Sequence, residues 1–192
     1  EYKKKEIKKI INLINVKKYK DVISKSRVLI KKFPHDYIFY NALGMALMNV
    51  GQYDESLDVL NKAIRLDENN IHILNNLGLV NGYLANYKKA NEYYDRALKI
   101  KPNFLNALIN LSQLKEKLNL NNEAIEILKI ALKHYPEDYF LHYVVATIYQ
   151  FVGDFENSHL HFEKSLSINP NATEIYRLMS MTKKFKENDK DF

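Results

Sequence analysis

The sequence predicts an all-α fold, an α-solenoid of stacked helix-turn-helix repeats. Residues 75–90 (NNLGLVNGYLANYKKA), shifted by 34 positions, align with residues 41–56 (NALGMALMNVGQYDES) and with residues 109–124 (INLSQLKEKLNLNNEA). The four prolines follow the same period: Pro34, Pro102, Pro136 and Pro170. Within each unit, large apolar residues recur at helical spacing in two stretches joined by a turn, which indicates a helical hairpin.

The period divides the chain into five hairpin repeats, a terminal helix and a tail. The repeats span residues 3–36, 37–70, 71–104, 105–138 and 139–172, the helix 173–187 and the tail 188–192. In the second repeat, Tyr40, Leu43 and Leu47 mark the first helix, and Leu57 and Leu60 mark the second. We therefore expect one continuous array across residues 1–192, without strands.

Turn residues and small residues support this register. Gly51 and Gly153 suit the left-handed conformation that ends a helix, and Asn119 tolerates it. Glycine inside a helix costs roughly 0.5–1 kcal/mol, so Gly78 and Gly82 predict a close approach by a neighbouring helix. Small residues recur at three places of the period: Gly44, Gly78, Ser112 and Ala146; Ser56, Ala90, Ala124 and Ser158; Ala63, Ala97, Ala131 and Ser165.

These positions resemble the tetratricopeptide repeat (TPR) family, whose 34-residue motif has Leu-Gly, small, aromatic and proline positions at set offsets. The third repeat carries Leu74, Leu77, Gly78, Ala90, Tyr94, Ala97 and Pro102. The first repeat departs from the pattern, with large residues at small positions and Ser26 in place of the aromatic residue. The resemblance implies a right-handed superhelix that binds a protein or peptide on its concave face.

Projecting the register places an amide-rich set of side chains on that face. We predict that a peptide contacts Asn41, Met45, Asn75, Asn76, Tyr83, Asn106, Asn110, Gln113 and Tyr143. Asn76 and Asn110 lie one period apart and resemble the asparagine ladder in the TPR arm of O-linked sugar transferases, although Ala42 and Val144 interrupt it. The alternative is that these asparagines reflect the general richness of the chain in Asn, Lys, Ile and Tyr.

A second binding mode of the family is not supported. TPR domains that hold the acidic tails of heat-shock chaperones use lysine, arginine and asparagine at fixed places on three successive first helices. The corresponding places hold Asn41, Met45, Asn76, Asn106 and Asn110, of which only Asn76 matches. Without cations to pair with a terminal carboxylate, this clamp is not expected.

The net charge of +6 is concentrated in the first repeat. Residues 1–34 hold 12 Lys/Arg and 3 Asp/Glu, a net charge of +9, whereas the remaining residues hold 17 and 20, a net charge of −3. A solvated helix face is the favoured explanation, because a phosphate-binding surface would add arginines and aromatics directed at a ligand. Nucleic-acid or acidic-partner binding through this repeat is an alternative.

Two features that the sequence lacks bear on its cellular compartment and on contact with membranes. There is no cysteine and no uncharged apolar run near the length of a membrane span, which favours a cytoplasmic protein without a membrane partner. The chain begins without methionine, so we expect a fragment of a longer product. Homo-oligomerisation is left open.

Catalytic patterns are missing, so no enzymatic activity, cofactor or metal is expected for this chain. His159 and His161 are two residues apart, whereas helical metal pairs need three or four. No HExxH motif or phosphate-binding glycine loop occurs. The acid pairs at residues 54–55 and 137–138 lie where helices should begin, and a capping role explains them.

The last residues suggest a different context. Residues 174–192 (EIYRLMSMTKKFKENDKDF) resemble the segment that joins TPR arrays to a sulfotransferase-like domain. That resemblance implies an alternative function, in which the repeats present a polypeptide acceptor to a sulfotransferase-like or glycosyltransferase domain outside this chain.

Overall fold

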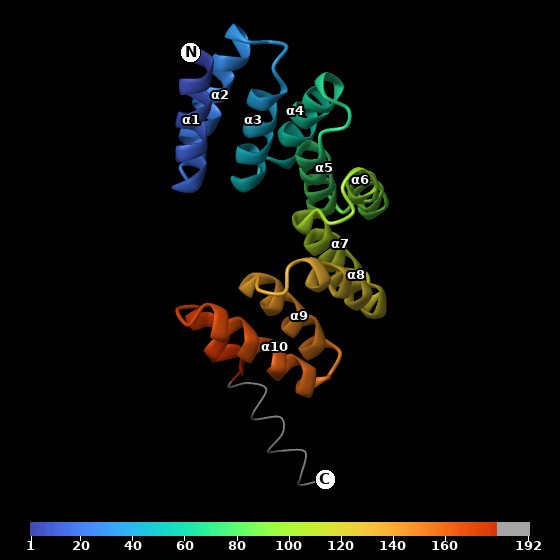
Figure 1. Ribbon diagram of the computed structural model, residues 1–192. Coiled ribbons are helices and arrows are strands. Elements are labelled where there is room, and N and C mark those ends of the chain that lie inside the picture. Colours follow the sequence, from blue (N-terminus) through green and yellow to red (C-terminus); the bar gives the residue numbers. More distant parts are fainter. Residues whose placement is uncertain (180–192) are drawn as a thin grey trace. The chain divides into compact units, whose positions relative to one another are not determined.

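The computed structural model describes residues 1–179, and this part of the chain is helical apart from short connections, with no strand (Figure 1). The helices are α1 (Tyr2–Asn15), α2 (Tyr19–Lys32), α3 (Tyr37–Asn49), α4 (Tyr53–Leu66), α5 (Ile71–Tyr83), α6 (Tyr87–Ile100), α7 (Leu105–Lys117), α8 (Asn121–His134), α9 (Tyr139–Phe151) and α10 (Phe155–Ile168). Residues 173–179 are also helical. The predicted all-α fold of helix pairs is confirmed.

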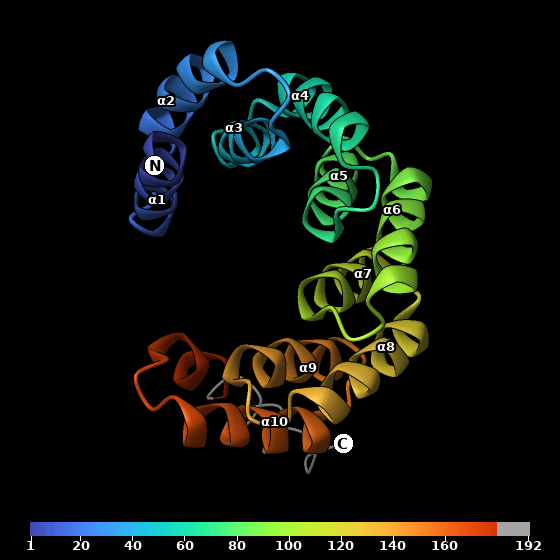
Figure 2. The same ribbon diagram turned by 45° about the horizontal axis from the view of Figure 1, so that its top comes forward.

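The helices form two compact units, and each is a stack of hairpins. The first comprises Glu1–Pro102 and the second begins at Asn103. In the first unit, α3 and α5 form an inner layer, and α4 and α6 form an outer layer (Figure 2). Helix α3 packs against α5, and in the second unit α7 packs against α9. In these pairs, the first helices of successive repeats are therefore neighbours.

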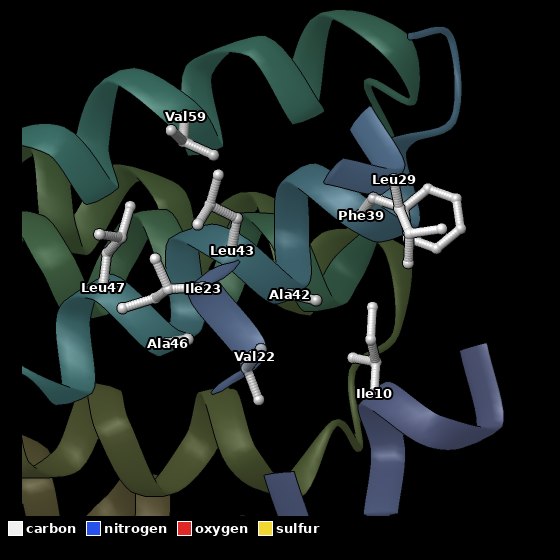
Figure 3. Packing of buried hydrophobic residues seen from close by; sticks show 10 residues of the cluster. All are labelled: Ile10, Val22, Ile23, Leu29, Phe39, Ala42, Leu43, Ala46, Leu47 and Val59. Carbon is white, nitrogen blue, oxygen red and sulfur yellow. The ribbon is translucent and has the colours of Figure 1, made fainter. Parts of the chain in front are cut away.

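The divergent first repeat joins the core through large side chains. Ile10, Val22 and Leu29, which replace small residues of the repeat pattern, are at most 2% exposed. They belong to one apolar cluster with Phe39 and Leu43 from the next repeat (Figure 3). Larger side chains thus fill a wider space between α1 and α2, so the first hairpin is a packed part of its unit.

In the later repeats, small residues allow the two helices of a hairpin to touch. A Cβ atom built on Gly44 would lie 2.5 Å from Cγ of Leu60, and one built on Gly78 would lie 2.4 Å from Cε1 of Tyr94. The prediction for Gly78 is confirmed. The prediction for Gly82 is wrong, because no atom of the described residues lies within 4 Å of a Cβ built there.

Each hairpin turn has a residue with positive φ at the same place of the period. These residues are Lys17, Gly51, Ala85, Asn119 and Gly153, with φ between 57° and 82°. The next residue closes the turn through its backbone N–H, which donates to a carbonyl five residues earlier, as from Lys18 to Leu13 at 2.9 Å. The glycine and asparagine positions were expected, whereas Lys17 and Ala85 carry no sequence signal for this conformation.

Side-chain caps begin several helices. Asp36, Asn70, Asp138 and Asp154 each accept a hydrogen bond from a backbone N–H in the first turn of α3, α5, α9 and α10 respectively. The capping role expected for the acid pair at residues 137–138 is confirmed for Asp138. The other pair, residues 54–55, lies in the first turn of α4.

The predicted terminal helix is described from residue 173 to residue 179. Ile175 is 2% exposed and packs against Ala146 of α9 and Phe162 of α10, so this segment covers the end of the last hairpin. The predicted continuation over residues 180–187 and the tail 188–192 lie outside the described residues. Most of the segment that resembles a sulfotransferase junction lies there too.

A histidine pair replaces apolar packing in the last hairpin. Nδ1 of His142 lies 2.9 Å from Nδ1 of His161, and Nε2 of His142 lies 2.9 Å from the carbonyl oxygen of Pro136. Since a carbonyl only accepts, His142 carries its proton on Nε2, and His161 donates from Nδ1. Burial, with a smaller contribution from His142, lowers the pKa of His161 to about 4. The fold therefore favours the neutral form of the His161 ring.

The contrast between the two glycines of α5 can be tested with matched substitutions. Gly78→Ala should lower the free energy of unfolding by about 1–3 kcal/mol, because the new methyl group overlaps the buried Tyr94 ring. Gly82→Ala should raise it by about 0.5–1 kcal/mol, because alanine favours helix and the space is open. Denaturant unfolding measures both. Equal effects at the two sites would contradict the proposed helix contact.

The histidine pair should make stability depend on pH in the acid range. The pKa of His161 is lower in the folded state than its ordinary value of 6.5, so unfolding takes up a proton. Stability is retained above pH 6.5 and declines as the pH falls towards 4. We expect a loss on the order of 1 kcal/mol between these values, since His161 is partly exposed and solvent screens it.

The chain supplies a control for this effect. In the fourth repeat, Leu108 and Ile127 occupy the places of His142 and His161. The double variant His142→Leu/His161→Ile should therefore fold and should lose this part of the pH dependence. Thermal melting at about pH 7, 5.5 and 4.5 compares the two proteins. Parallel declines in melting temperature would show that His161 does not take up a proton on unfolding.

Candidate functional site

The inner layer of the first unit carries two bonded asparagines. Asn41 lies on α3 and Asn76 on the neighbouring α5, and both side chains are partly exposed. Nδ2 of Asn76 donates a hydrogen bond to Oδ1 of Asn41 over 2.8 Å. The bond ties together the first helices of two successive repeats and holds both amides at the surface.

This bond leaves complementary groups for a further partner. After it forms, Asn41 still has the two N–H donors of its Nδ2 atom, and Asn76 has its Oδ1 acceptor. An extended peptide unit presents one carbonyl acceptor and one N–H donor. The Asn41–Asn76 pair can therefore bond to both polar groups of a peptide backbone without contact to its side chains.

Apolar and aromatic side chains lie on the same two helices as the pair. Met45, one turn beyond Asn41, is partly exposed, and Asn49 donates from Nδ2 to the Met45 carbonyl oxygen over 2.9 Å. Tyr83 at the end of α5 is 57% exposed, and its ring stacks on Tyr53 with 4.9 Å between centroids. Both predicted apolar contacts, Met45 and Tyr83, thus remain available at the surface.

Asn75 differs from the other predicted residues of this unit. It is 6% exposed, so its amide faces the interior of the stack and offers little surface to a ligand. The neighbouring Asn76 is partly exposed, because successive helix residues point about 100° apart. The structure thus separates these two adjacent asparagines into an interior and a surface position.

The second unit places its predicted residues on α7 and α9. Asn106 and Gln113 are exposed on α7, and Asn110 between them is partly exposed. Tyr143 of α9 is partly exposed and stacks on Phe140 with 5.8 Å between ring centroids. Asn76 and Asn110 belong to different units, so their ladder remains a prediction.

The repeat period predicts Asn41 and Asn76 as surface residues but does not predict that they are bonded. A ladder joins residues one period apart, whereas this hydrogen bond joins residues 35 apart. Side chains from neighbouring helices meet according to how the helices pack, which the repeat period alone does not specify. The sequence could have indicated this bond through a search of the first helices for polar residues separated by one residue more or one residue less than the period.

The basic first repeat uses several of its cations within its own unit. Lys9 and Lys25 both pair with Glu6, which is 4% exposed, and their hydrogen bonds, led by that of Lys25, lower the pKa of Glu6 to about 2. Lys3 pairs with Asp36 over 2.8 Å, and Arg27 pairs with Glu55 over 2.6 Å. These contacts reduce the charge that the repeat offers to a ligand.

Residues 1–179 contain no cluster of three metal-ligating side chains that could hold a metal ion. Among the helices described, none combines the length and apolar character of a membrane span. The histidine pair in the last hairpin was not expected, because the histidines are dispersed along the sequence. The sequence does contain an indication of this pair, because both histidines occupy positions where the fourth repeat has the apolar residues Leu108 and Ile127.

Known protein families match over most of the chain. Three models, each described as a tetratricopeptide repeat, match residues 37–103, 84–143 and 141–172. Among curated proteins, none matches this sequence.

Solved structures share the fold at low sequence identity. A thermophilic TPR protein of Thermus thermophilus is similar with a TM-score of 0.84 at 13% identity, over 93% of this chain and 97% of that chain. MamA residues 41 to the end, from Desulfovibrio magneticus, give 0.67 at 19% identity, over 81% and 88%. YrrB, a TPR protein with an unusual peptide-binding site, gives 0.64 at 18% identity, over 91% and 90%.

The family models together run from residue 37 to residue 172, and the helix pairs, the small contact positions and the turns agree with them. The chain belongs to the tetratricopeptide repeat family.

Proposed function

We propose that this chain is a protein-interaction module that binds an extended polypeptide segment along its first helices. The observation that carries the proposal is the hydrogen bond between Asn76 and Asn41, which holds two amides at the surface in one orientation. A pre-ordered pair loses less conformational entropy on binding than two separate side chains would. The pair is therefore suited to contact a peptide backbone.

Other predicted residues would extend this contact within each unit. In the first unit, Met45 and Tyr83 offer apolar surface on the same helices as the amides, whereas Asn75 lies in the interior. In the second unit, Asn106, Asn110 and Gln113 offer amides, and the exposed part of Tyr143 offers apolar contact. Every one of these predicted contact residues is uncharged.

The chemistry of these residues defines the kind of partner. Neutral amides hydrogen-bond to a backbone regardless of the side chains that it carries, so binding should be tolerant of sequence and insensitive to salt. The similarity to YrrB adds that a protein of this fold has a peptide-binding site. A module that presents a polypeptide acceptor to a transferase domain would use the same surface.

The proposal can be tested with peptides selected from a random library against the full chain. For a selected peptide, Asn41→Ala with Asn76→Ala should weaken binding roughly fivefold to a hundredfold, because two hydrogen-bonding side chains are lost. The helical circular dichroism spectrum should stay unchanged. Asn91→Ala is the matched control, since Asn91 lies on the second helix α6 and bonds within it to Asp95.

Two outcomes would contradict this function. Failure to enrich any peptide would argue against a peptide-binding module. Binding that falls steeply with salt, survives the double alanine change and is lost on reversing the charges of Lys17, Lys18 and Lys20 would assign the contact to the basic first repeat.

A further inference from the structure

A pocket lies between the second helices α4 and α6, away from the residues of the proposed peptide surface, and Leu57 and Tyr93 form its apolar walls. Its volume is about 260 Å³, and its lining includes Asn61 of α4, Asn81 of α5, and Lys89, Glu92 and Arg96 of α6. Since all these residues belong to the first unit, the pocket is formed by the second and third repeats alone.

Asn81 is the unusual member of this lining. It is 1% exposed, and its Nδ2 donates to the Leu77 carbonyl oxygen over 2.8 Å. Its Oδ1 atom has no hydrogen-bond partner among the described residues. The bond to Leu77 fixes the orientation of the amide, because a carbonyl cannot accept from another carbonyl. Such a buried acceptor is costly unless a ligand supplies a donor.

In two other repeats, the positions equivalent to those of the pocket residues are filled by a buried apolar side chain or by ion pairs. In the second repeat, Leu47 replaces Asn81 and is fully buried, and Glu55, equivalent to Lys89, pairs with Arg27 over 2.6 Å. In the fourth repeat, Lys115 replaces Asn81 and pairs with Glu123, again at the place of Lys89, over 2.8 Å.

In the third repeat neither contact forms. Asn61 occupies the place of Arg27, so it offers no charge to Lys89. Among the described residues, neither Lys89 nor Glu92 takes part in an ion pair. Arg96 is occupied, since its Nη2 atom donates to the Glu68 carbonyl oxygen over 3.3 Å. Within the described part of the chain, the pocket therefore combines one buried acceptor with a rim that holds an unpaired cation and an unpaired anion.

We propose that this pocket binds a primary carboxamide, the side chain of a glutamine or asparagine on a partner protein. Its two N–H groups would donate to Asn81 Oδ1 and to the Glu92 carboxylate, and its carbonyl oxygen would accept from Lys89. The exposed side chains of Lys89 and Glu92 move aside to admit it. A carboxylate fits less well, because it would face the Asn81 oxygen and Glu92 without a donor. This inference does not depend on the proposed peptide surface.

The test is a titration of the full chain, observed by NMR, with N-acetylglutamine methylamide and, separately, with N-acetylglutamate methylamide. The glutamine compound should produce saturable shifts of the Asn81 side-chain amide and of nearby backbone amides in α4 and α6. The glutamate compound has the same shape without the donor, so its binding should be weaker by about tenfold or more. Equal binding of the two, or no saturable shift with glutamine, would overturn the proposal.

Two variants copied from other repeats complete the test. Asn81→Leu reproduces Leu47 and should abolish binding while raising the melting temperature, because the unsatisfied acceptor is removed. Asn61→Arg with Lys89→Glu reproduces the Arg27–Glu55 pair and should also abolish binding by closing the rim. Both should leave unchanged the affinity for peptides that depend on Asn41 and Asn76. Undiminished glutamine binding in either variant would refute the site.

Discussion

The contact between the two helices of each hairpin governs the rest of this structure. At Gly44 and Gly78 the absence of a side chain lets Leu60 and Tyr94 reach the backbone of the first helix. Ser56 adds a hydrogen bond from its Oγ to the Gly44 carbonyl oxygen over 2.7 Å, so even the polar small residue binds the two helices together. Because this close approach recurs in the second and third repeats, these two hairpins stack in the same way.

Because of this stacking, the faces of a first helix lie in different surroundings and favour different residue types. One face is buried against the second helix, flanking faces meet the neighbouring repeats, and the remaining strip is open to solvent. Asn75 and Asn76 show the division between adjacent residues, since the first is buried and the second is partly exposed. An amide on the open strip costs little stability, and it can bond to an amide of the next repeat. The fold thus permits polar ligand contacts without weakening its core.

The repeat period made the fold predictable from the sequence. The period places the helices, the turns and the small contact residues, because each depends on contacts within a single hairpin. What the period could not provide were contacts that depend on side-chain direction between helices. The bond between Asn41 and Asn76, the pairing of His142 with His161 and the unsatisfied oxygen of Asn81 among the described residues are of this kind. The histidine pair and Asn81 lie where one repeat differs from its neighbours, so departures from the period are the best guide to those two features.

The turn between the two helices of each hairpin has a further consequence, for how freely the sequence can vary. Lys17, Ala85 and Asn119 hold a left-handed backbone that disfavours residues with a Cβ atom by roughly 1–2 kcal/mol, yet the turn closes there as it does at Gly51 and Gly153. The surrounding helices therefore impose the turn, and its residue is free to change. Glycine at these places would supply stability that the chain does not now use. That reserve could offset destabilising substitutions elsewhere on the surface, so the sequence of the repeats can change while they stay folded.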